Sequence, residues 1–220
     1  MTLIKQSGSA LTGMIGGIVL VNFNGGTYMR RAPQRQKKDS WTPQQLLHRQ
    51  RFSMVNKFCG QFKSSLIPQI WNAATFGKVQ NFGKVQITNM MSGYALFLKS
   101  NMPAFAPDGS VADVKKLRLS TGSLTLPQGI EAHRSAVGTS TIQVSWDYDG
   151  HIGGKNLKQE LMLISAGDGL YSEITATGIL KGTLNGSFEL PESPKAATHI
   201  YLFFTSQDRR DYSESVCFEI

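Results

Sequence analysis

The sequence predicts an α+β protein in two parts: an N-terminal β-hairpin with two helices, then an Ig-like antiparallel β-sandwich. Two observations support this fold class. Apolar spacing changes from three and four residues to alternation near residue 117, and turn formers are frequent, with 22 Gly and 8 Pro in 220 residues. This length allows one large domain or two small ones. We expect residues 1–112 to form the basic hairpin and helical region and residues 113–220 the sandwich.

The first predicted element is a β-hairpin over residues 17–32. Two apolar runs flank Asn24-Gly25-Gly26, and Asn-Gly supplies the positive φ angles that a tight hairpin needs. Further glycines precede the hairpin, among them Gly13 and Gly16. They favour an irregular or closely packed lead-in over a helix.

A long amphipathic helix is expected next, over about residues 43–65. A polar basic connector, residues 33–40, leads to Thr42 as the N-cap and Pro43 at the first helical position. Apolar residues then recur at spacings of three, four and seven. Pro68 should end or kink this helix. Helical spacing returns over residues 85–99, and the Pro-rich stretch 101–113 is predicted to be the linker between the domains.

The C-terminal half predicts short strands at regular spacing, which is typical of an antiparallel sandwich of about seven strands. Trp146 lies within one of these runs and suits a core position. The expected strands span residues 117–126, 130–136, 141–147, 158–165, 171–177, 183–190, 198–206 and 212–219.

A short internal repeat, TFGKVQ followed by NFGKVQ, lies at residues 75–86. Its period of six and its two copies are too few for a solenoid. It is either a local coincidence or a loop with two similar turns.

Charge is distributed unevenly along the chain. Residues 1–100 carry 13 Lys or Arg and one acid, Asp39, whereas residues 101–220 carry 10 Lys or Arg and 14 acids, for an overall net charge of +8. Such an asymmetry indicates two regions with different partners. The basic half suits nucleic acid, an anionic surface or an acidic neighbour, although a basic surface also serves solubility alone.

Compartment signals are few. Cys59 and Cys217 lie 158 residues apart, and we expect two buried free thiols rather than a disulfide. The N-terminus lacks the long unbroken apolar core of a secretory signal, and no stretch reaches about 18 apolar residues. We therefore expect no signal peptide, no membrane span and a cytoplasmic or virion-associated protein.

Several weak motifs occur in an order that resembles a family. The chain is similar to an uncharacterised bacterial family of roughly this length, known only as a domain of unknown function, and the resemblance spans nearly the whole chain. It implies an Ig- or fibronectin-like C-terminal half and no assigned activity. The motifs are Gly13-x-x-Gly16, Gly25-Gly26, Arg30-Arg31-x-Pro33, Gln50-Arg51-Phe52, Leu119-Ser120-x-Gly122-x-Leu124 and Tyr212-Ser213-Glu214-Ser215.

Catalytic signatures are absent from the sequence. It contains no G-x-S-x-G, H-E-x-x-H, Walker loop or CxxC, and its four histidines show no ligand spacing. Asp147 and Asp149 suggest a calcium loop, but the later ligands are missing, so a strand-end turn is favoured. We expect no enzyme activity, no cofactor and no metal.

The candidate contact residues for nucleic acid or an acidic partner are basic. Lys and Arg neutralise phosphates, and Tyr28 or Trp41 could stack on bases, but no recognised reader motif appears. The candidates are Arg30, Arg31, Arg35, Lys37, Lys38, Arg49 and Arg51.

The leading hypothesis is a non-catalytic structural or assembly protein, such as a component of a phage-like particle or another bacterial multi-subunit assembly. The basic and acidic halves are complementary, so copies could associate head to tail, and the hairpin could extend another sheet. The alternative is a nucleic-acid-binding protein that uses the basic half. A third hypothesis is a sandwich that binds a ligand or partner through its loops.

Overall fold

The computed structural model describes most of the chain and divides it into two compact units. The units are residues 1–45 and 46–220, so the expected boundary at 112/113 falls inside the second unit. The fold is α+β. The described residues are 4–7, 10–23, 26–33, 41–75, 79–82, 85–88, 91–136, 138–147, 154–192 and 197–220.

The first unit contains a four-stranded antiparallel sheet in the order β1-β2-β3-β4. The predicted hairpin is confirmed as the pair β3 and β4. The lead-in is not a helix, as expected, but it forms the regular strands β1 and β2 and is not irregular. Gly16 and Gly17 have φ angles of +54° and +82°, which is the turn geometry that lets β2 pair with β3. The strands are β1 (Ile4–Ser7), β2 (Ala10–Ile15), β3 (Ile18–Phe23) and β4 (Gly26–Arg31).

Three helices follow, and their starts match local capping chemistry. Thr42 and Gln45 exchange backbone-to-side-chain hydrogen bonds at the start of α1, the reciprocal arrangement of a capping box. Pro68 lies in the first turn of α2, after α1 has ended. The helices are α1 (Pro43–Gln61), α2 (Ile67–Thr75) and α3 (Gly93–Asn101).

The helix expected over residues 85–99 is wrong in its first part. Residues Val85–Thr88 form β6, which pairs with β5, Val79–Phe82. The two copies of the hexapeptide repeat thus contribute to a hairpin whose turn lies outside the described residues. Alternating β-branched residues favour a strand here. The helix begins only after Ser92, whose hydroxyl accepts a hydrogen bond from the Ala95 N–H.

The second unit also contains two antiparallel sheets, which we call the paired sheets. One has the order β10-β9-β13-β14, with β11 also pairing with β9, and the other has the order β12-β8-β7. Their strands are β7 (Glu131–Arg134), β8 (Thr141–Ser145), β9 (Glu160–Gly167), β10 (Leu170–Tyr171), β11 (Thr175–Leu180), β12 (Asn185–Glu189), β13 (His199–Thr205) and β14 (Val216–Glu219). The short 3-10 helices among the described residues are η2 (Met102–Ala104), η3 (Val114–Lys116), η4 (Gly154–Lys158) and η5 (Lys181–Thr183).

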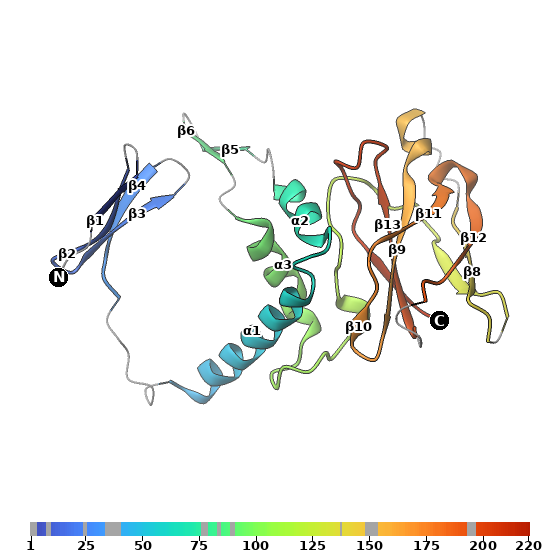
Figure 1. Cartoon of the computed structure of the whole chain (residues 1–220), viewed down its shortest axis with the longest axis horizontal. Coiled ribbons are helices and arrows are strands. Elements are labelled where there is room, and N and C mark those ends of the chain that lie inside the picture. The colour runs from blue at the N-terminus through green and yellow to red at the C-terminus, as the bar shows by residue number, and fades with distance from the viewer. Residues whose placement is uncertain are drawn as a thin grey trace. The chain divides into compact units, whose positions relative to one another are not determined.

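The central strands β9 and β13 are buried on both faces. Leu163 and Leu202 pack with Trp146 in a core shared with the smaller sheet, whereas Ile164 and Phe203 pack in a second core with the helices. Figure 1 shows the helices on one side of β9 and β13, and β8 and β12 on the other. Continuous apolar runs are typical of strands covered on both faces.

Two expectations for residues 101–126 are corrected. The stretch 101–113 is part of the second unit's core rather than an exposed linker, since Asn101, Ala104 and Phe105 are buried. Its Pro and Gly residues shape turns within packed structure. The strand at 117–126 is also wrong. This stretch makes only an isolated parallel bridge, between Leu124 and Ser213, and the Leu119 N–H donates to Ser215 Oγ over 3.0 Å instead of to a neighbouring strand.

Candidate functional site

The N-terminal sheet has two apolar faces. Successive side chains of a strand point to opposite faces, and directly paired residues share a face. We call the two sides the Ile18 face and the Val19 face. The Ile18 face carries Ile15, Ile18, Leu20, Met29 and Arg31, and the Val19 face carries Met14, Val19, Val21, Tyr28 and Arg30.

No described element of residues 1–45 covers either face of the sheet. The described elements of residues 1–45 are these four strands and the first turn of α1, so the described residues of this unit form no second layer. None of its residues with a described exposure is buried. Met29 is 72% exposed on the Ile18 face and Met14 is 55% exposed on the Val19 face. Apolar surface of this kind marks an interaction site.

The predicted basic residues are only partly brought together. Arg30 and Arg31 are both exposed at the end of β4, but as neighbours in a strand they project from opposite faces. They therefore do not form one cationic surface on the sheet. The other three candidates of this segment, Arg35, Lys37 and Lys38, lie outside the described residues.

Arg49 and Arg51 lie on α1 and also diverge. Two residues along a helix corresponds to about 200° of rotation, so the two side chains leave on different sides. Arg49 is exposed, whereas Arg51 is half-buried, and its Nε has no hydrogen-bond partner among the described residues. The structure thus spreads the four described candidates over several surfaces.

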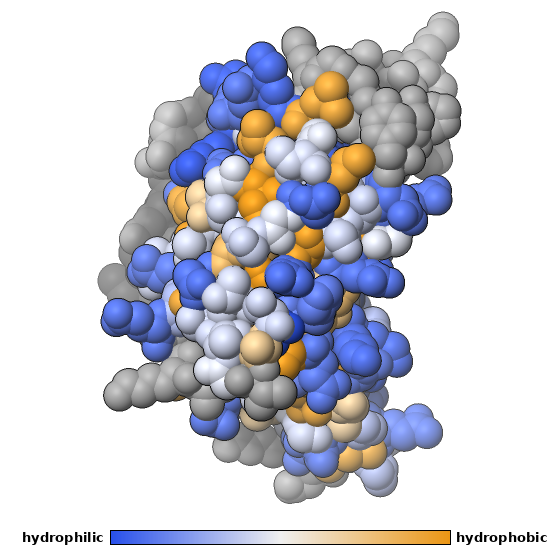
Figure 2. Space-filling model, turned by 90° about the vertical axis from the view of Figure 1, so that its right-hand side faces the viewer, coloured by the Kyte–Doolittle hydropathy of each residue, from blue (hydrophilic) through white to orange (hydrophobic). Residues whose placement is uncertain are grey.

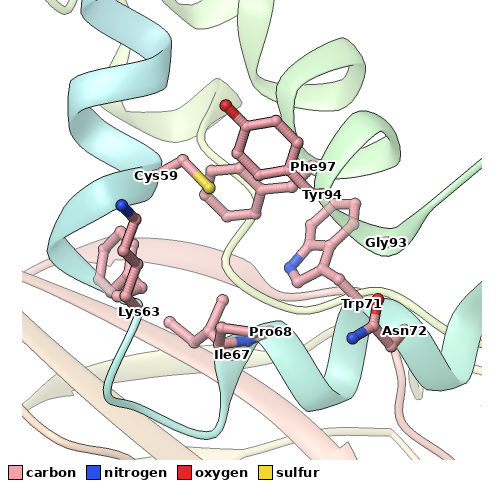
Figure 3. A pocket seen from close by; sticks show the side chains of 10 residues that line it. Cys59, Lys63, Ile67, Pro68, Trp71, Asn72, Gly93, Tyr94 and Phe97 are labelled. Carbon is pink, nitrogen blue, oxygen red and sulfur yellow. The ribbon is translucent and has the colours of Figure 1, made fainter. Parts of the chain in front are cut away.

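A pocket of about 210 Å³ lies among the three helices. Its walls are mainly apolar: Ile67, Trp71 and Phe97 are almost fully buried. Figure 3 shows Cys59 and Lys63 entering from the side of α1, with Trp71 and Asn72 opposite on α2. Tyr94 from α3 lies beside them, so all three helices contribute to the pocket.

Hydrogen bonds and ring contacts brace the pocket walls. Trp71 Nε1 donates to the Leu119 carbonyl over 3.1 Å, and the Trp71 and Phe97 rings meet edge to face with centroids 5.1 Å apart. The Tyr94 hydroxyl donates to Asn56 Oδ1, which ties α3 to α1. The pocket is therefore preformed by packing rather than by a loop.

The pocket carries a positive charge beside its cysteine. Burial raises the pKa of the Cys59 thiol above its ordinary value, and the Lys63 ammonium opposes part of that rise. At neutral pH the thiol is protonated, so in the pocket wall it acts as a small hydrophobic group with a weak S–H donor. Lys63 is exposed and supplies the only ionised group among the described lining residues.

A second group of titratable side chains, Tyr171, Tyr201 and Cys217, is packed against the helical core. Burial raises the pKa of Tyr171 to about 12, and it also raises the pKa of Tyr201 and of Cys217. These groups are protonated at neutral pH and so do not provide a phenolate or thiolate nucleophile there. Their packing role is evident, since the Tyr201 hydroxyl donates to the Val114 carbonyl over 3.2 Å.

Within the described ranges, no three His, Cys, Asp or Glu side chains gather in a way that could hold a metal ion. Both cysteines are free thiols. Among the described helices, none has the length and apolar character required to cross a bilayer.

Comparisons with known proteins give no relative. No protein-family model, curated protein or solved structure matches the chain.

Sequence reasoning missed both the second apolar sheet face and the pocket. The run Ile18-Val19-Leu20-Val21 was a usable signal for the sheet, because apolar residues at successive strand positions point to both sides. The pocket had no such signal, since its lining comes from three helices that only the tertiary fold brings together.

Proposed function

We propose that the protein is a non-catalytic structural or assembly subunit whose N-terminal sheet packs against a second copy of the chain. The observation that carries this proposal is a sheet with apolar side chains on both faces and no second layer among the described residues of its unit. An apolar sheet face is stable in water only when another layer covers it.

The two-faced character favours a second copy over a folded-back monomer. One neighbouring body covers one face of a sheet, so even a chain that folded back on itself would leave the other face for a second copy to cover. Burial of apolar area stabilises by about 25 cal/mol per Å², which makes an uncovered face of this kind costly. A second copy of the chain can cover this face with its own apolar side chains, so no other protein is required.

Charge favours head-to-tail association between copies. Residues 1–45 carry six Lys or Arg and one acid, whereas residues 113–220 carry 10 Lys or Arg and 13 acids. Figure 2 shows the side of the paired sheets, where hydrophobic residues gather between hydrophilic ones. Leu157 and Leu180 are exposed in this unit. A head-to-tail contact closes into a ring or continues as a filament, depending on its rotation.

Substitutions on each sheet face test this function. Ile18→Glu and Val19→Glu place a carboxylate on opposite faces, and each should shift the protein toward the single-chain species, because an unpaired buried charge opposes packing. Sedimentation velocity measures the fraction assembled. Gln69→Glu, which adds the same charge at an exposed position on α2, should leave it unchanged.

The proposal fails if neither face variant changes the fraction assembled. If only one does, a single face is used and the other requires a different explanation.

Nucleic-acid binding is a second candidate function. It is favoured by the exposed Arg30 and Arg31 and by the absence of any Asp or Glu between Asp39 and Asp108. Binding of an oligonucleotide should then weaken steeply with salt, and replacing both arginines by alanine should reduce the salt slope. An affinity that does not depend on salt would argue against it.

For the paired sheets we propose an Ig-like sandwich. The support is an all-antiparallel pairing and a core that both sheets share around Trp146. Trp146 is further held by a hydrogen bond of 2.9 Å from its Nε1 to the Lys181 carbonyl.

A further inference from the structure

The charged residues of the helical segment are all basic. Residues 40–107 contain seven Lys or Arg and no Asp or Glu. The basic side chains of α1 and α3 are Arg49, Arg51, Lys57 and Lys99, and Lys63 lies in the turn after α1. Because this segment contains no carboxylate, its own net charge is positive, which favours an anionic partner.

The size of the pocket decides what kind of group enters it. Sites for drug-sized ligands are clefts of roughly 300–1,000 Å³. The pocket among the helices, at about 210 Å³, is smaller than these. It is close to engineered cavities of roughly 150 Å³ that hold one benzene ring. One bulky apolar side chain therefore fits it better than a whole small-molecule ligand does.

The surroundings of the pocket resemble the centre of a protein interface. Phe52, Asn56 and Cys59 recur at spacings of four and three, so they line one side of α1, and Lys63 follows in the turn after its end. Three large apolar or aromatic side chains are exposed in this region. Phe52 belongs to the row on α1, Leu66 follows Lys63 by three residues, and Tyr94 lines the pocket. Interfaces concentrate their binding energy where an anchor residue fills such a preformed pocket.

We propose that this pocket takes one bulky apolar side chain of an acidic protein segment, whose carboxylates face the Lys63 ammonium. Two observations support this occupant: the segment around the pocket contains no acid, and the pocket volume suits a single side chain. The proposal concerns the second unit and does not depend on how the N-terminal sheet is covered.

The test uses the full chain and synthetic peptides. The probe is a fluorescein-labelled peptide with Phe flanked by three Glu on each side, and the comparison peptides carry Ala at the centre or Lys in the flanks. Fluorescence anisotropy should show the Phe peptide binding about tenfold or more tightly than the Ala peptide, as expected for burying an aromatic side chain. The Lys-flanked peptide should not bind.

Two pairs of variants separate the anchor from the charge. Cys59→Phe fills the pocket and should remove the preference for Phe, whereas Gln61→Phe adds the same bulk on another side of α1 and should keep it. Lys63→Glu should weaken binding at least fivefold, and Lys158→Glu, at an exposed site on η4, should not. If Cys59→Phe fails to fold, the Lys63 pair and the peptide comparison still decide.

Each alternative occupant gives a different result. Equal binding of the Phe and Ala peptides, or no binding at millimolar peptide, would overturn the proposal. A single-stranded oligo-dT that binds more tightly than the Phe peptide and is weakened equally by Lys63→Glu would assign the surface to nucleic acid instead. Phenylacetate that binds as tightly as the peptide would make the pocket a small-molecule site.

Discussion

At the scale of single residues, the buried Lys181 makes hydrogen bonds to three separate segments of the chain, a role that no sequence pattern predicted. Its side chain is 1% exposed, and its Nζ donates to the Thr125 carbonyl over 2.6 Å and to Gln159 Oε1 over 3.1 Å. Its backbone N–H and carbonyl are also used, by the Gln159 carbonyl and by Trp146. A lysine is buried in this way only when its ammonium is well hydrogen-bonded.

Replacing this lysine should therefore destabilise the paired sheets. Lys181→Ala removes the buried stem and leaves two acceptors without their donor, so the free energy of unfolding should fall by about 3 kcal/mol. Denaturant titration measures the change. Lys158→Ala, at an exposed position, should stay within about 0.5 kcal/mol. An equally small effect at Lys181 would show that its hydrogen bonds do not stabilise the fold.

The thiol of Cys59 gives a pH-dependent readout of the pocket. Burial raises its pKa above the ordinary value of 9.0, and the Lys63 ammonium lowers it in part. A raised pKa means less thiolate at a given pH, so alkylation by iodoacetamide should reach its half-maximal rate above pH 9.0. Removing the opposing charge with Lys63→Gln should raise the pKa further and slow alkylation at pH 8.5.

Mass spectrometry of the peptides that contain Cys59 and Cys217 follows the two thiols separately. Lys57→Gln serves as the control, because among the described residues Lys63, and not Lys57, acts electrostatically on this thiol. Faster alkylation in the Lys63→Gln variant would contradict the assigned position of the ammonium.

At the scale of elements, the close approach of α2 and α3 shapes the pocket. A Cβ on Gly93 would lie 2.5 Å from the backbone carbon of Trp71, which cannot move aside as a side chain can. Gly93 thus lets the start of α3 contact α2 directly. By contrast, Gly60 on α1 has open space around its Cβ position.

This contrast predicts opposite signs for the same substitution. Gly93→Ala should lower the free energy of unfolding by about 1–3 kcal/mol through overpacking. Gly60→Ala should raise it by roughly 0.5–1 kcal/mol, because alanine favours a helix over glycine. Thermal unfolding of both variants checks this. A stable Gly93→Ala protein would mean that α2 and α3 are further apart than described.

The elements that the sequence predicted well are those fixed by local chemistry. The β3–β4 hairpin, the start of α1 after Thr42 and most strands of the paired sheets follow from turn formers, caps and alternation. The incorrect predictions concern segments whose structure depends on tertiary contacts. Gly16 and Gly17 indicated an irregular lead-in, yet they form a hairpin turn, and the Pro-rich stretch 101–113 looked like a linker although Phe105 is buried.

The candidate site shows the same division. The basic residues were visible in the sequence, but their separation onto different faces was not, because it depends on strand parity at Arg30 and Arg31 and on helix rotation at Arg49 and Arg51. The pocket required three helices to meet. The charge distribution itself is a property of the sequence, in which residues 1–100 contain a single acid, Asp39.

At the scale of the whole molecule, the chain combines a well-packed unit with a small one whose described residues form no core of their own. The second unit buries β9 and β13 on both faces. The first unit buries none of its residues with a described exposure. A chain built in this way is expected to complete its first unit through association, and the opposite charges of its two ends give that association a direction.

The most direct measurement of this claim is the molar mass by light scattering on a sizing column, at low and high protein concentration and at low and high salt. We predict a multiple of the 24.2 kDa chain mass that grows with concentration and falls with salt, as charges are screened. The 260/280 nm ratio of the peak should be that of protein alone. A mass of 24.2 kDa under every condition would contradict the account.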